Sequence, residues 1–187
     1  MADQGAEGLL SPYLRKQRLK AAVPHVNGRV LDVGCGSGAM ADLVPADRYI
    51  GVDVDDDSIT EARRRHPQHH FQAMLPPAEP AFDTIVSLAV IEHVKDPGEF
   101  LRDLALRLLP GSQSCIVLTT PHPAVDWVHT IGASVGLFSR HASEEHEQLL
   151  AQGSLTALAD ECGLKLNTYR RFLLGANQLA VFRRKEG

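Results

Sequence analysis

Short apolar runs, separated by polar and turn-forming residues, recur along the first two thirds of the chain. Runs of this length that are rich in Val, Ile and Phe are typical of β-strands, and Phe82–Leu88 is apolar enough to be buried on both faces of a sheet. The pattern predicts strands over Arg29–Val33, Tyr49–Val54, His69–Ala73, Phe82–Leu88 and Ser114–Thr119.

Apolar residues at helical spacing occupy several of the segments around these strands. Ser11-Pro12 is a helix start signal, Asp57 or Ser58 can cap a helix, and Pro110-Gly111 ends one. We therefore predict helices over Leu9–Val23, Asp57–Arg65 and Pro97–Leu109, and a helical turn over Ala39–Leu43.

The alternation of strand and helix breaks after Thr120. Residues 121–146 are irregular, a helix is predicted over Glu147–Cys162, and two strands, Leu164–Leu174 and Asn177–Arg183, are predicted to form a hairpin through Gly175-Ala176. Alternating strands and helices favour a single α/β domain on a doubly wound parallel sheet.

The glycine-rich segment after the first strand carries the strongest chemical signal. Gly34, Gly36 and Gly38 follow the apolar run directly, and glycines permit tight turns and close approach of a ligand to the main chain. Open α/β sheets bind ligands at the carboxyl ends of their strands. We therefore predict a ligand site at this turn rather than a plain connecting loop.

Two ligand classes fit this turn. Gly34, Gly36 and Ala39 match the loose dinucleotide pattern, and Asp53 follows Gly34 by 19 residues, near the spacing of a ribose-binding acid. Asp32, however, precedes the glycines and would repel a pyrophosphate, whereas it suits a ligand that carries an ammonium and a sulfonium.

The motifs around this turn resemble those of the class I S-adenosylmethionine-dependent methyltransferases. The resemblance is closest to the UbiE/UbiG-like group, methyltransferase domain 11, which acts mainly on small molecules. It implies a Rossmann-like seven-stranded sheet of order 3-2-1-4-5-7-6 with the last strand antiparallel. The matching motifs are Val30–Gly38, Gly51–Asp53, Phe82–Ser87, Ile91–Val94 and Leu108–Gly111.

The resemblance also implies a role for individual residues. Asp32 would lie by the methionine amino group, Asp53 would accept both ribose hydroxyls, and Val54 would lie against the adenine. The implied S-adenosylmethionine-binding residues are Asp32, Gly34, Cys35, Gly36, Gly38, Asp53, Val54, Gln72, Ala73, Leu88 and Ala89, of which Leu88 and Ala89 would line the sulfonium end. The product would be S-adenosylhomocysteine.

One departure from the family concerns the adenine. Many relatives place an aspartate after the third strand to hold the adenine amino group, whereas this chain has Gln72-Ala73 there. Gln72 or the main chain would have to take its place.

Transfer of a methyl group to a hydroxyl or amine releases a proton, so a general base near neutral pKa helps. Histidine fits that need, and the chain contains nine. We rank His93 and His141 first and His122 next as candidate bases. His93 can instead be a structural residue at a helix start. Related metal-binding methyltransferases carry an acid where this chain has Ala89, so we predict no metal.

The irregular segment has a composition suited to an acceptor wall or lid, because it is apolar and carries the single Trp. It can also be a satellite packing cluster. We divide the chain into an N-terminal tail and helix, 1–26, and an S-adenosylmethionine-binding domain, 27–187, with the lid segment at 121–146.

Composition and charge bear on the partners and the location of the protein. A net charge of −4 argues against a nucleic-acid partner, and no apolar run is long enough for a membrane span. The three cysteines are an odd number and show no C-x-x-C spacing, so we expect no disulfide framework. Together with the absence of a leader segment, this predicts a cytoplasmic protein.

The sequence thus favours a methyltransferase acting on a small-molecule acceptor, most often through oxygen. Two alternatives stay open: an NAD(P)-binding oxidoreductase or epimerase-like protein, and a non-catalytic S-adenosylmethionine-binding protein. The sequence lacks the Tyr-x-x-x-Lys pair that is expected of the NAD(P)-binding oxidoreductase, because none of the three tyrosines has a lysine four residues later.

Overall fold

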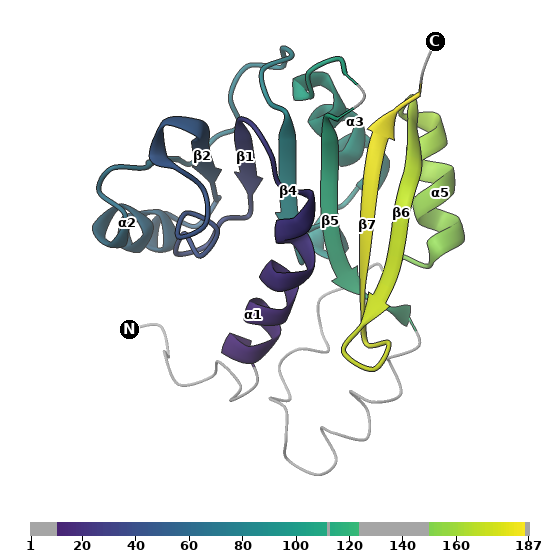
Figure 1. The fold of residues 1–187 in the computed structure, drawn as a ribbon, viewed down its shortest axis with the longest axis horizontal. Helices are drawn as coiled ribbons and strands as arrows, with labels where there is room; N and C mark the ends of the chain where they lie inside the picture. Colours follow the sequence, from purple (N-terminus) through teal and green to yellow (C-terminus); the bar gives the residue numbers. More distant parts are fainter. Residues whose placement is uncertain (1–10, 112, 124–149, 186–187) are drawn as a thin grey trace.

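The computed structural model describes residues 11–111, 113–123 and 150–185, which form a seven-stranded sheet between helices (Figure 1). The strand order is β3-β2-β1-β4-β5-β7-β6. β7 runs antiparallel to both neighbours, and the other pairings are parallel, which confirms the predicted topology. The strands are β1 Val30–Val33, β2 Tyr49–Val52, β3 His70–Gln72, β4 Thr84–Leu88, β5 Cys115–Pro121, β6 Leu164–Phe172 and β7 Asn177–Arg184.

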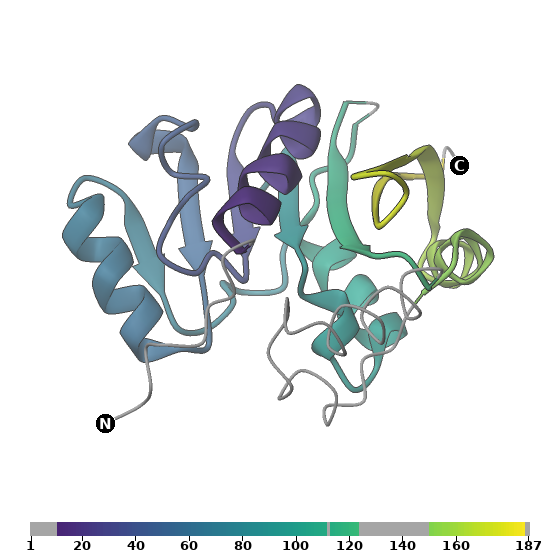
Figure 2. The same cartoon turned by 90° about the horizontal axis from the view of Figure 1, so that it is seen from below.

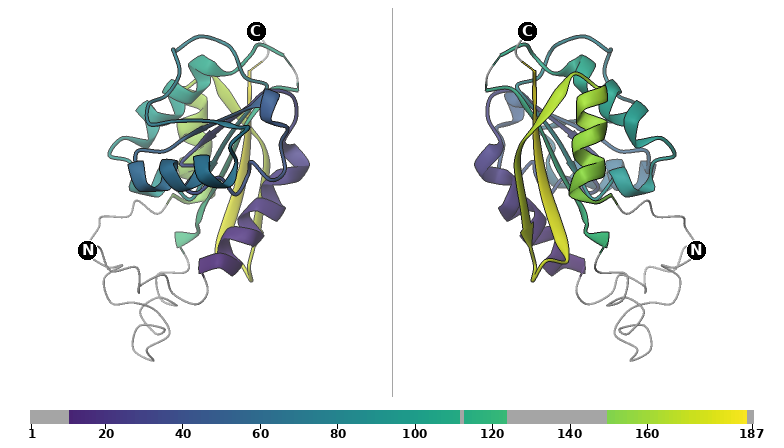
Figure 3. Two further views of the ribbon diagram at one scale, coloured as in Figure 1. Left: turned by 90° about the vertical axis from the view of Figure 1, so that its left-hand side faces the viewer. Right: turned by 90° about the vertical axis from the view of Figure 1, so that its right-hand side faces the viewer.

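Helices cover both faces of the sheet. α1 (Ser11–Ala22) lies on the face opposite α3 (Pro97–Arg107) and α5 (Gln152–Glu161), as the side views show (Figure 3). α2 (Asp56–Arg65) packs Ile59 and Ala62 into the same apolar cluster as Ala22 of α1. Viewed from below, α2 and α5 lie at opposite ends of the sheet (Figure 2).

The core consists of two apolar clusters, one on each face of the sheet. They form because successive side chains of a buried strand point to opposite faces. On the α3/α5 side, Leu31, Ile85 and Phe82 pack against Leu101 and Leu155. The other cluster, on the α1/α2 side, takes the alternate strand residues, such as Val30, Val86 and Val117. Burial on both faces explains why the central strands read as continuous apolar runs.

The turn-forming segment between β1 and β2 departs from the prediction. Ala39–Leu43 does not form a helix: bonds from Ala41 N to the Gly38 carbonyl and from Leu43 N to the Met40 carbonyl close separate four-residue turns. A short 3₁₀ helix, Ala46–Arg48, then leads into β2. Gly38 has a left-handed φ of +84°, and this conformation prevents a regular helix from starting at the loop.

Two helix boundaries also differ. Asp55, rather than Asp57 or Ser58, caps α2, because its side chain accepts a hydrogen bond from Ser58 N at 3.0 Å. α3 ends at Arg107, since Leu108 adopts extended backbone and Phe82 forms an isolated parallel bridge to it.

The hairpin between β6 and β7 is longer than predicted. Phe172 pairs with Asn177, so Leu173–Ala176 form a four-residue loop rather than the two-residue link Gly175-Ala176. Leu173 and Leu174 have φ of +53° and +54°, and Leu174 is fully exposed. Left-handed backbone costs a branched residue about 1–2 kcal/mol, so this loop stores strain.

Replacing Leu174 by asparagine is expected to stabilise the protein by about 1 kcal/mol, because asparagine tolerates the left-handed region. The unfolding temperature should rise by about 2–4 °C in thermal denaturation. Leu43→Asn is the matched control: Leu43 is also exposed but has no positive φ. An equal gain in both variants would refute the strain explanation.

Candidate active site at the carboxyl ends of the strands

The glycine loop is pinned to the neighbouring strand by its own main chain. Gly34 N and Cys35 N both donate to the Val52 carbonyl, at 2.8 and 3.0 Å. Gly34 has a φ of +76°, and a Cβ there would lie 2.3 Å from Val90 Cγ2. Gly36 has a φ of +51° and open space where a Cβ would be. The first glycine thus serves packing, and the second faces a void.

That void is a cavity of about 230 Å³ between α1 and the glycine loop. Six of the predicted cofactor residues line it: Asp32, Gly34, Cys35, Gly36, Leu88 and Ala89. The remaining lining residues are Arg15, Arg18, Leu19, Ser37, Ala39 and Met40. The cavity therefore lies where the carboxyl ends of the two adjacent parallel strands β1 and β4 meet.

Asp32 is the buried acid of this cavity, with only 4% of its surface exposed. Tyr49 Oη donates a hydrogen bond to Asp32 Oδ2 at 2.8 Å. Burial raises the pKa of Asp32 to about 7, the Tyr49 hydrogen bond opposes that rise, and the negative charge of Asp53 adds to it. The carboxyl group is consequently poised to change its charge near neutral pH.

Asp53 directly follows β2, and its carboxylate faces the glycine loop. Its Oδ2 accepts a hydrogen bond from Gly36 N at 2.7 Å, and its Oδ1 accepts one from Asp55 N at 3.0 Å. A carboxylate has about four lone-pair sites, so two acceptor positions remain available for hydroxyl groups of a ligand.

The end of β4 is strained. Ala89 has a φ of +60°, and its amide donates to the Thr119 carbonyl at 2.8 Å. A non-glycine residue held in the left-handed region is typical of functional sites. Ala89 and Leu88 both line the cavity, so the strained residue borders the ligand space.

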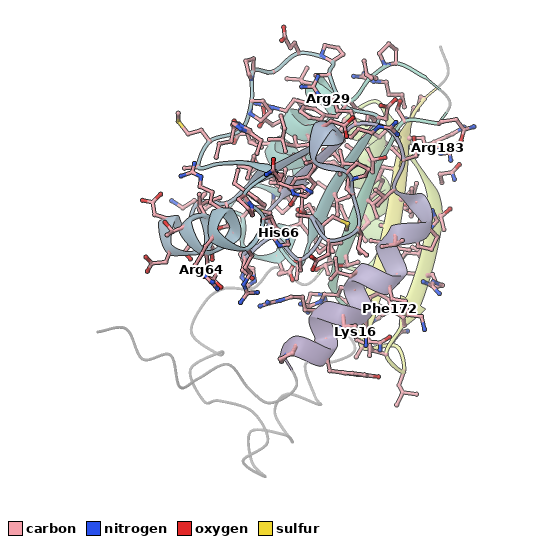
Figure 4. The ribbon with its side chains drawn as sticks, turned by 60° about the vertical axis from the view of Figure 1, so that its left-hand side comes forward. Lys16, Arg29, Arg64, His66, Phe172 and Arg183 are labelled. Atoms are coloured by element: carbon pink, nitrogen blue, oxygen red, sulfur yellow. The ribbon has the colours of Figure 1, made fainter. Side chains whose placement is uncertain are left out.

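Four predicted cofactor residues, together with Asp53, lie outside the cavity lining: Gly38, Val54, Gln72 and Ala73. A Cβ at Gly38 would lie 2.9 Å from His66 and 3.1 Å from Phe71 of β3, so this glycine is packed against protein. His66 follows the end of α2, and Arg64 of the same helix is exposed (Figure 4). Val54 is 92% exposed. Gln72 Nε2 donates to the Met74 carbonyl, and Gln72 Oε1 bonds to His70, so its amide is already engaged.

The candidate bases are dispersed. His93 is exposed, and neither it nor His122 lines the cavity. His122 N donates to the Ala176 carbonyl beside the hairpin, and desolvation followed by the charge of Arg171 lowers its pKa. His141 and most of the predicted lid, 124–146, lie outside the described residues.

Sequence reasoning missed two arginines that line the cavity and a tyrosine, Tyr49, that bonds to the lining residue Asp32. Arg15 and Arg18 come from α1, which was assigned to a segment preceding the domain, yet α1 packs on the sheet and borders the cavity. Their spacing of three predicts that both lie on one helix face, but not that this face borders the cavity. From the sequence, Tyr49 was predicted only to be the first residue of a strand.

Within the described ranges, no group of three or more His, Cys, Asp or Glu side chains is arranged to hold a metal ion. In the same part of the chain, no helix has the length and apolar character needed to cross a membrane.

An open, mostly parallel sheet, a glycine loop after β1 and an acid directly after β2 define a Rossmann-like ligand-binding protein. The comparison with protein families is more specific: the model described as "Methyltransferase domain" matches residues 8–169. The chain therefore belongs to the methyltransferase domain family.

Individual relatives agree with this family. The chain is 35% identical over 99 residues to a probable S-adenosylmethionine-dependent methyltransferase of Mycolicibacterium smegmatis, covering 50% of this chain and 38% of that protein. It is 30% identical over 117 residues to the ubiquinone biosynthesis O-methyltransferase of Caulobacter sp., covering 53% and 46%. The chain thus spans less than half the length of these relatives.

The fold recurs in solved structures. Magnesium protoporphyrin IX methyltransferase from Synechocystis, solved with bound S-adenosylhomocysteine, superposes with a TM-score of 0.69 at 14% identity. The alignment covers 97% of this chain and 90% of that one. At this identity the likeness concerns the fold.

Proposed function

We propose that the protein is an S-adenosylmethionine-dependent methyltransferase that acts on a small-molecule acceptor, with oxygen as the acceptor atom. One observation carries the proposal: Asp53, fixed by Gly36 N at 2.7 Å, stands beside a cavity lined by Gly34, Gly36 and Asp32. The cofactor, when bound, supplies a methyl group already activated by its sulfonium, so positioning by the protein can provide much of the rate acceleration.

The charges around the cavity suit a zwitterionic ligand. Asp32 offers a buried carboxyl for an ammonium group, and Arg15 and Arg18 border the same cavity from α1 with positive charge suited to a carboxylate. A methionine moiety carries both groups. The open space at Gly36 allows the main chain to approach the ligand closely.

A separate observation supports the choice of oxygen and of the UbiE/UbiG-like group. The ubiquinone biosynthesis O-methyltransferase of Caulobacter sp. is a partial-length relative, and its printed name specifies O-methylation. Together with the Ile91–Val94 motif, it favours a hydroxyl acceptor over nitrogen or carbon.

Isothermal titration calorimetry with S-adenosylhomocysteine tests the cofactor directly, with NAD and NADP as competitors. We expect S-adenosylhomocysteine to bind at micromolar or lower concentration and neither dinucleotide to displace it. Displacement by NAD would favour the oxidoreductase alternative. Transfer of labelled methyl from S-adenosylmethionine to an extracted metabolite pool would separate an enzyme from a non-catalytic binding protein.

Cofactor affinity should depend on pH through Asp32. The pKa of Asp32 is raised to about 7, so the carboxyl is neutral below that pH and cannot pair with an ammonium. Affinity for S-adenosylmethionine is therefore expected to rise as the pH increases through about 7. In Tyr49→Phe the carboxylate loses a stabilising hydrogen bond, and the midpoint should move upward by about one pH unit.

The control ligand for this experiment is methylthioadenosine, which lacks the amino acid end. Its affinity should be insensitive to pH over the same range and unaltered in Tyr49→Phe. A parallel pH dependence for both ligands would show that Asp32 does not contact the ammonium.

A further inference from the structure

The basic residues of the chain gather in two segments whose sequences contain no acid. Residues 11–29, which include α1, and residues 164–185, which include β6 and β7, hold eleven of the 19 Lys and Arg residues and none of the 23 Asp and Glu residues. The net charge of −4 is therefore the sum of a strongly basic part and an acidic remainder. A charge distribution this uneven is typical of proteins that contact an anionic surface.

The two basic segments lie against one another in the fold. Arg18 Nε of α1 donates a hydrogen bond to Asn177 Oδ1 at the start of β7, at 3.0 Å. Leu19 of α1 and Phe172 at the end of β6 pack against the same apolar cluster. The first turn of α1 and the loop between β6 and β7 consequently lie at the same edge of the sheet, as two views show (Figures 1 and 3).

The register of the hairpin places a basic side chain on each of its faces, next to the loop. Arg170 pairs with Leu179, which belongs to the apolar cluster on the α1 side, so both side chains point to that face. Arg171 is the next residue of the strand and points to the opposite face. Lys16 of α1 lies at this edge as well (Figure 4). All three basic residues are exposed.

Two large apolar side chains are exposed at the same edge. Leu174, in the loop between β6 and β7, is fully exposed, and Tyr13, in the first turn of α1, is 53% exposed. Leu174 also has a left-handed φ of +54°, which asparagine adopts more readily than leucine. A leucine that costs stability and stays fully exposed requires a reason outside the folded chain.

We propose that this edge is a docking surface for an anionic phospholipid bilayer. The hairpin-tip surface, as we call it, consists of apolar Leu174 and Tyr13 and of the basic residues Lys16, Arg170 and Arg171. Leu174 enters the headgroup region, the Tyr13 ring lies at the interface, and the basic side chains pair with lipid phosphates.

The combination of side chains favours a bilayer over other anionic partners. A bilayer takes up both the charges and the leucine, because its phosphates lie directly above its acyl chains. Nucleic acid would engage the charges through its phosphates and leave Leu174 in water. The proposal concerns lipid binding alone and holds whether or not the cavity binds S-adenosylmethionine.

Sedimentation of the full chain with vesicles tests the proposal. One set of vesicles contains phosphatidylcholine only, and the other contains equal amounts of phosphatidylcholine and phosphatidylglycerol. Wild type should bind the anionic vesicles at least about tenfold more tightly than the neutral ones, because each basic residue near an anionic surface strengthens binding. Added salt should release the protein, since it screens exposed charges.

Leu174→Asn separates docking from folding, because relief of the left-handed strain should make this variant more stable than wild type. Its binding to anionic vesicles should nevertheless fall about tenfold or more, since a leucine side chain no longer leaves water. Leu43→Asn is the matched control: Leu43 is 53% exposed and lies on the connection between β1 and β2. It should bind as wild type does.

The charges are tested by a double variant, Lys16→Gln with Arg170→Gln, which should bind anionic vesicles about tenfold more weakly or worse. The control is Lys95→Gln with Arg102→Gln, which removes the same charge from exposed positions just before α3 and on it. α3 lies on the face of the sheet opposite α1 (Figure 3). The control should bind within about threefold of wild type.

Three results would overturn the docking surface: no preference of wild type for anionic vesicles, equal vesicle binding by Leu174→Asn and wild type, or equal losses in the two double variants. Transfer RNA is the competitor that tests the other polyanion. Displacement of the vesicles by RNA that Leu174→Asn binds as tightly as wild type would assign the basic face to nucleic acid. Affinity for S-adenosylhomocysteine should be unchanged in every variant, so failure of the proposed function would show in calorimetry and leave the vesicle result intact.

Discussion

Replacement of Asp53 by alanine is expected to lower affinity for S-adenosylmethionine by about 10²-fold or more. Two ribose hydroxyls donated to a carboxylate contribute roughly 1.5–3 kcal/mol each, and each 1.4 kcal/mol corresponds to a factor of ten in affinity. Alanine also removes the acceptor that fixes Gly36 N at 2.7 Å, so the glycine loop loses a restraint. Calorimetric titration with S-adenosylmethionine and with S-adenosylhomocysteine measures the loss.

The acidic run beside Asp53 supplies a matched control. Asp57 lies in the first turn of α2, is exposed and is absent from the cavity lining. Asp57→Ala removes the same charge four residues further along the chain, so any general electrostatic effect should appear in both variants. We expect Asp57→Ala to bind within about threefold of wild type. Similar losses in the two variants would mean that Asp53 does not contact the ligand.

The positions of the strands were predictable from hydrophobic periodicity, which acts locally, whereas their order was implied by the family resemblance. Val30–Val33 and Thr84–Leu88 are mostly apolar and are buried on both faces, as is typical of central parallel strands. The hairpin loop was not predictable to the residue, because Leu173 and Leu174 adopt left-handed backbone that their residue type disfavours. Pairing of Phe172 with Asn177 imposes that conformation.

The candidate site also contains residues that were predictable from the sequence and residues that were not. Asp32, Gly34 and Gly36 belong to one contiguous motif, and the structure places all of them on one cavity. Arg15 and Arg18 reach that cavity only because α1 packs across the strand ends, a tertiary arrangement that local patterns do not encode.

The burial of Glu92, which is 1% exposed in the 3₁₀ helix η3 (Ile91–His93), was not predicted for a related reason. A charged residue beside a histidine reads as a solvated helix start, since glutamate is almost never fully buried. Its burial follows from the packing of η3 against β5, which brings residues about 30 positions apart in the sequence together. Long-range packing of this kind is visible only in three dimensions.

The two glycines of the loop should respond to alanine in opposite ways, because only one of them is packed against protein. In Gly34→Ala the new Cβ would lie 2.3 Å from Val90 Cγ2, at a φ of +76°. Overpacking and left-handed strain each cost about 1–3 kcal/mol, so we expect a loss of about 3 kcal/mol and a fall in unfolding temperature of about 10 °C. Gly36→Ala meets open space and should lose only about 1 kcal/mol.

The affinity for S-adenosylhomocysteine should show the reverse order, with the larger loss in Gly36→Ala. The added methyl group at Gly36 projects from the cavity wall, so Gly36→Ala is expected to weaken S-adenosylhomocysteine binding by about tenfold or more while the fold survives. Adding Val90→Ala to Gly34→Ala removes the clashing Cγ2 atom and should restore the steric share of the lost stability, leaving the left-handed strain. Thermal denaturation and calorimetry of the three variants measure both quantities. A Gly36→Ala protein that binds the ligand as tightly as wild type would place the cofactor elsewhere.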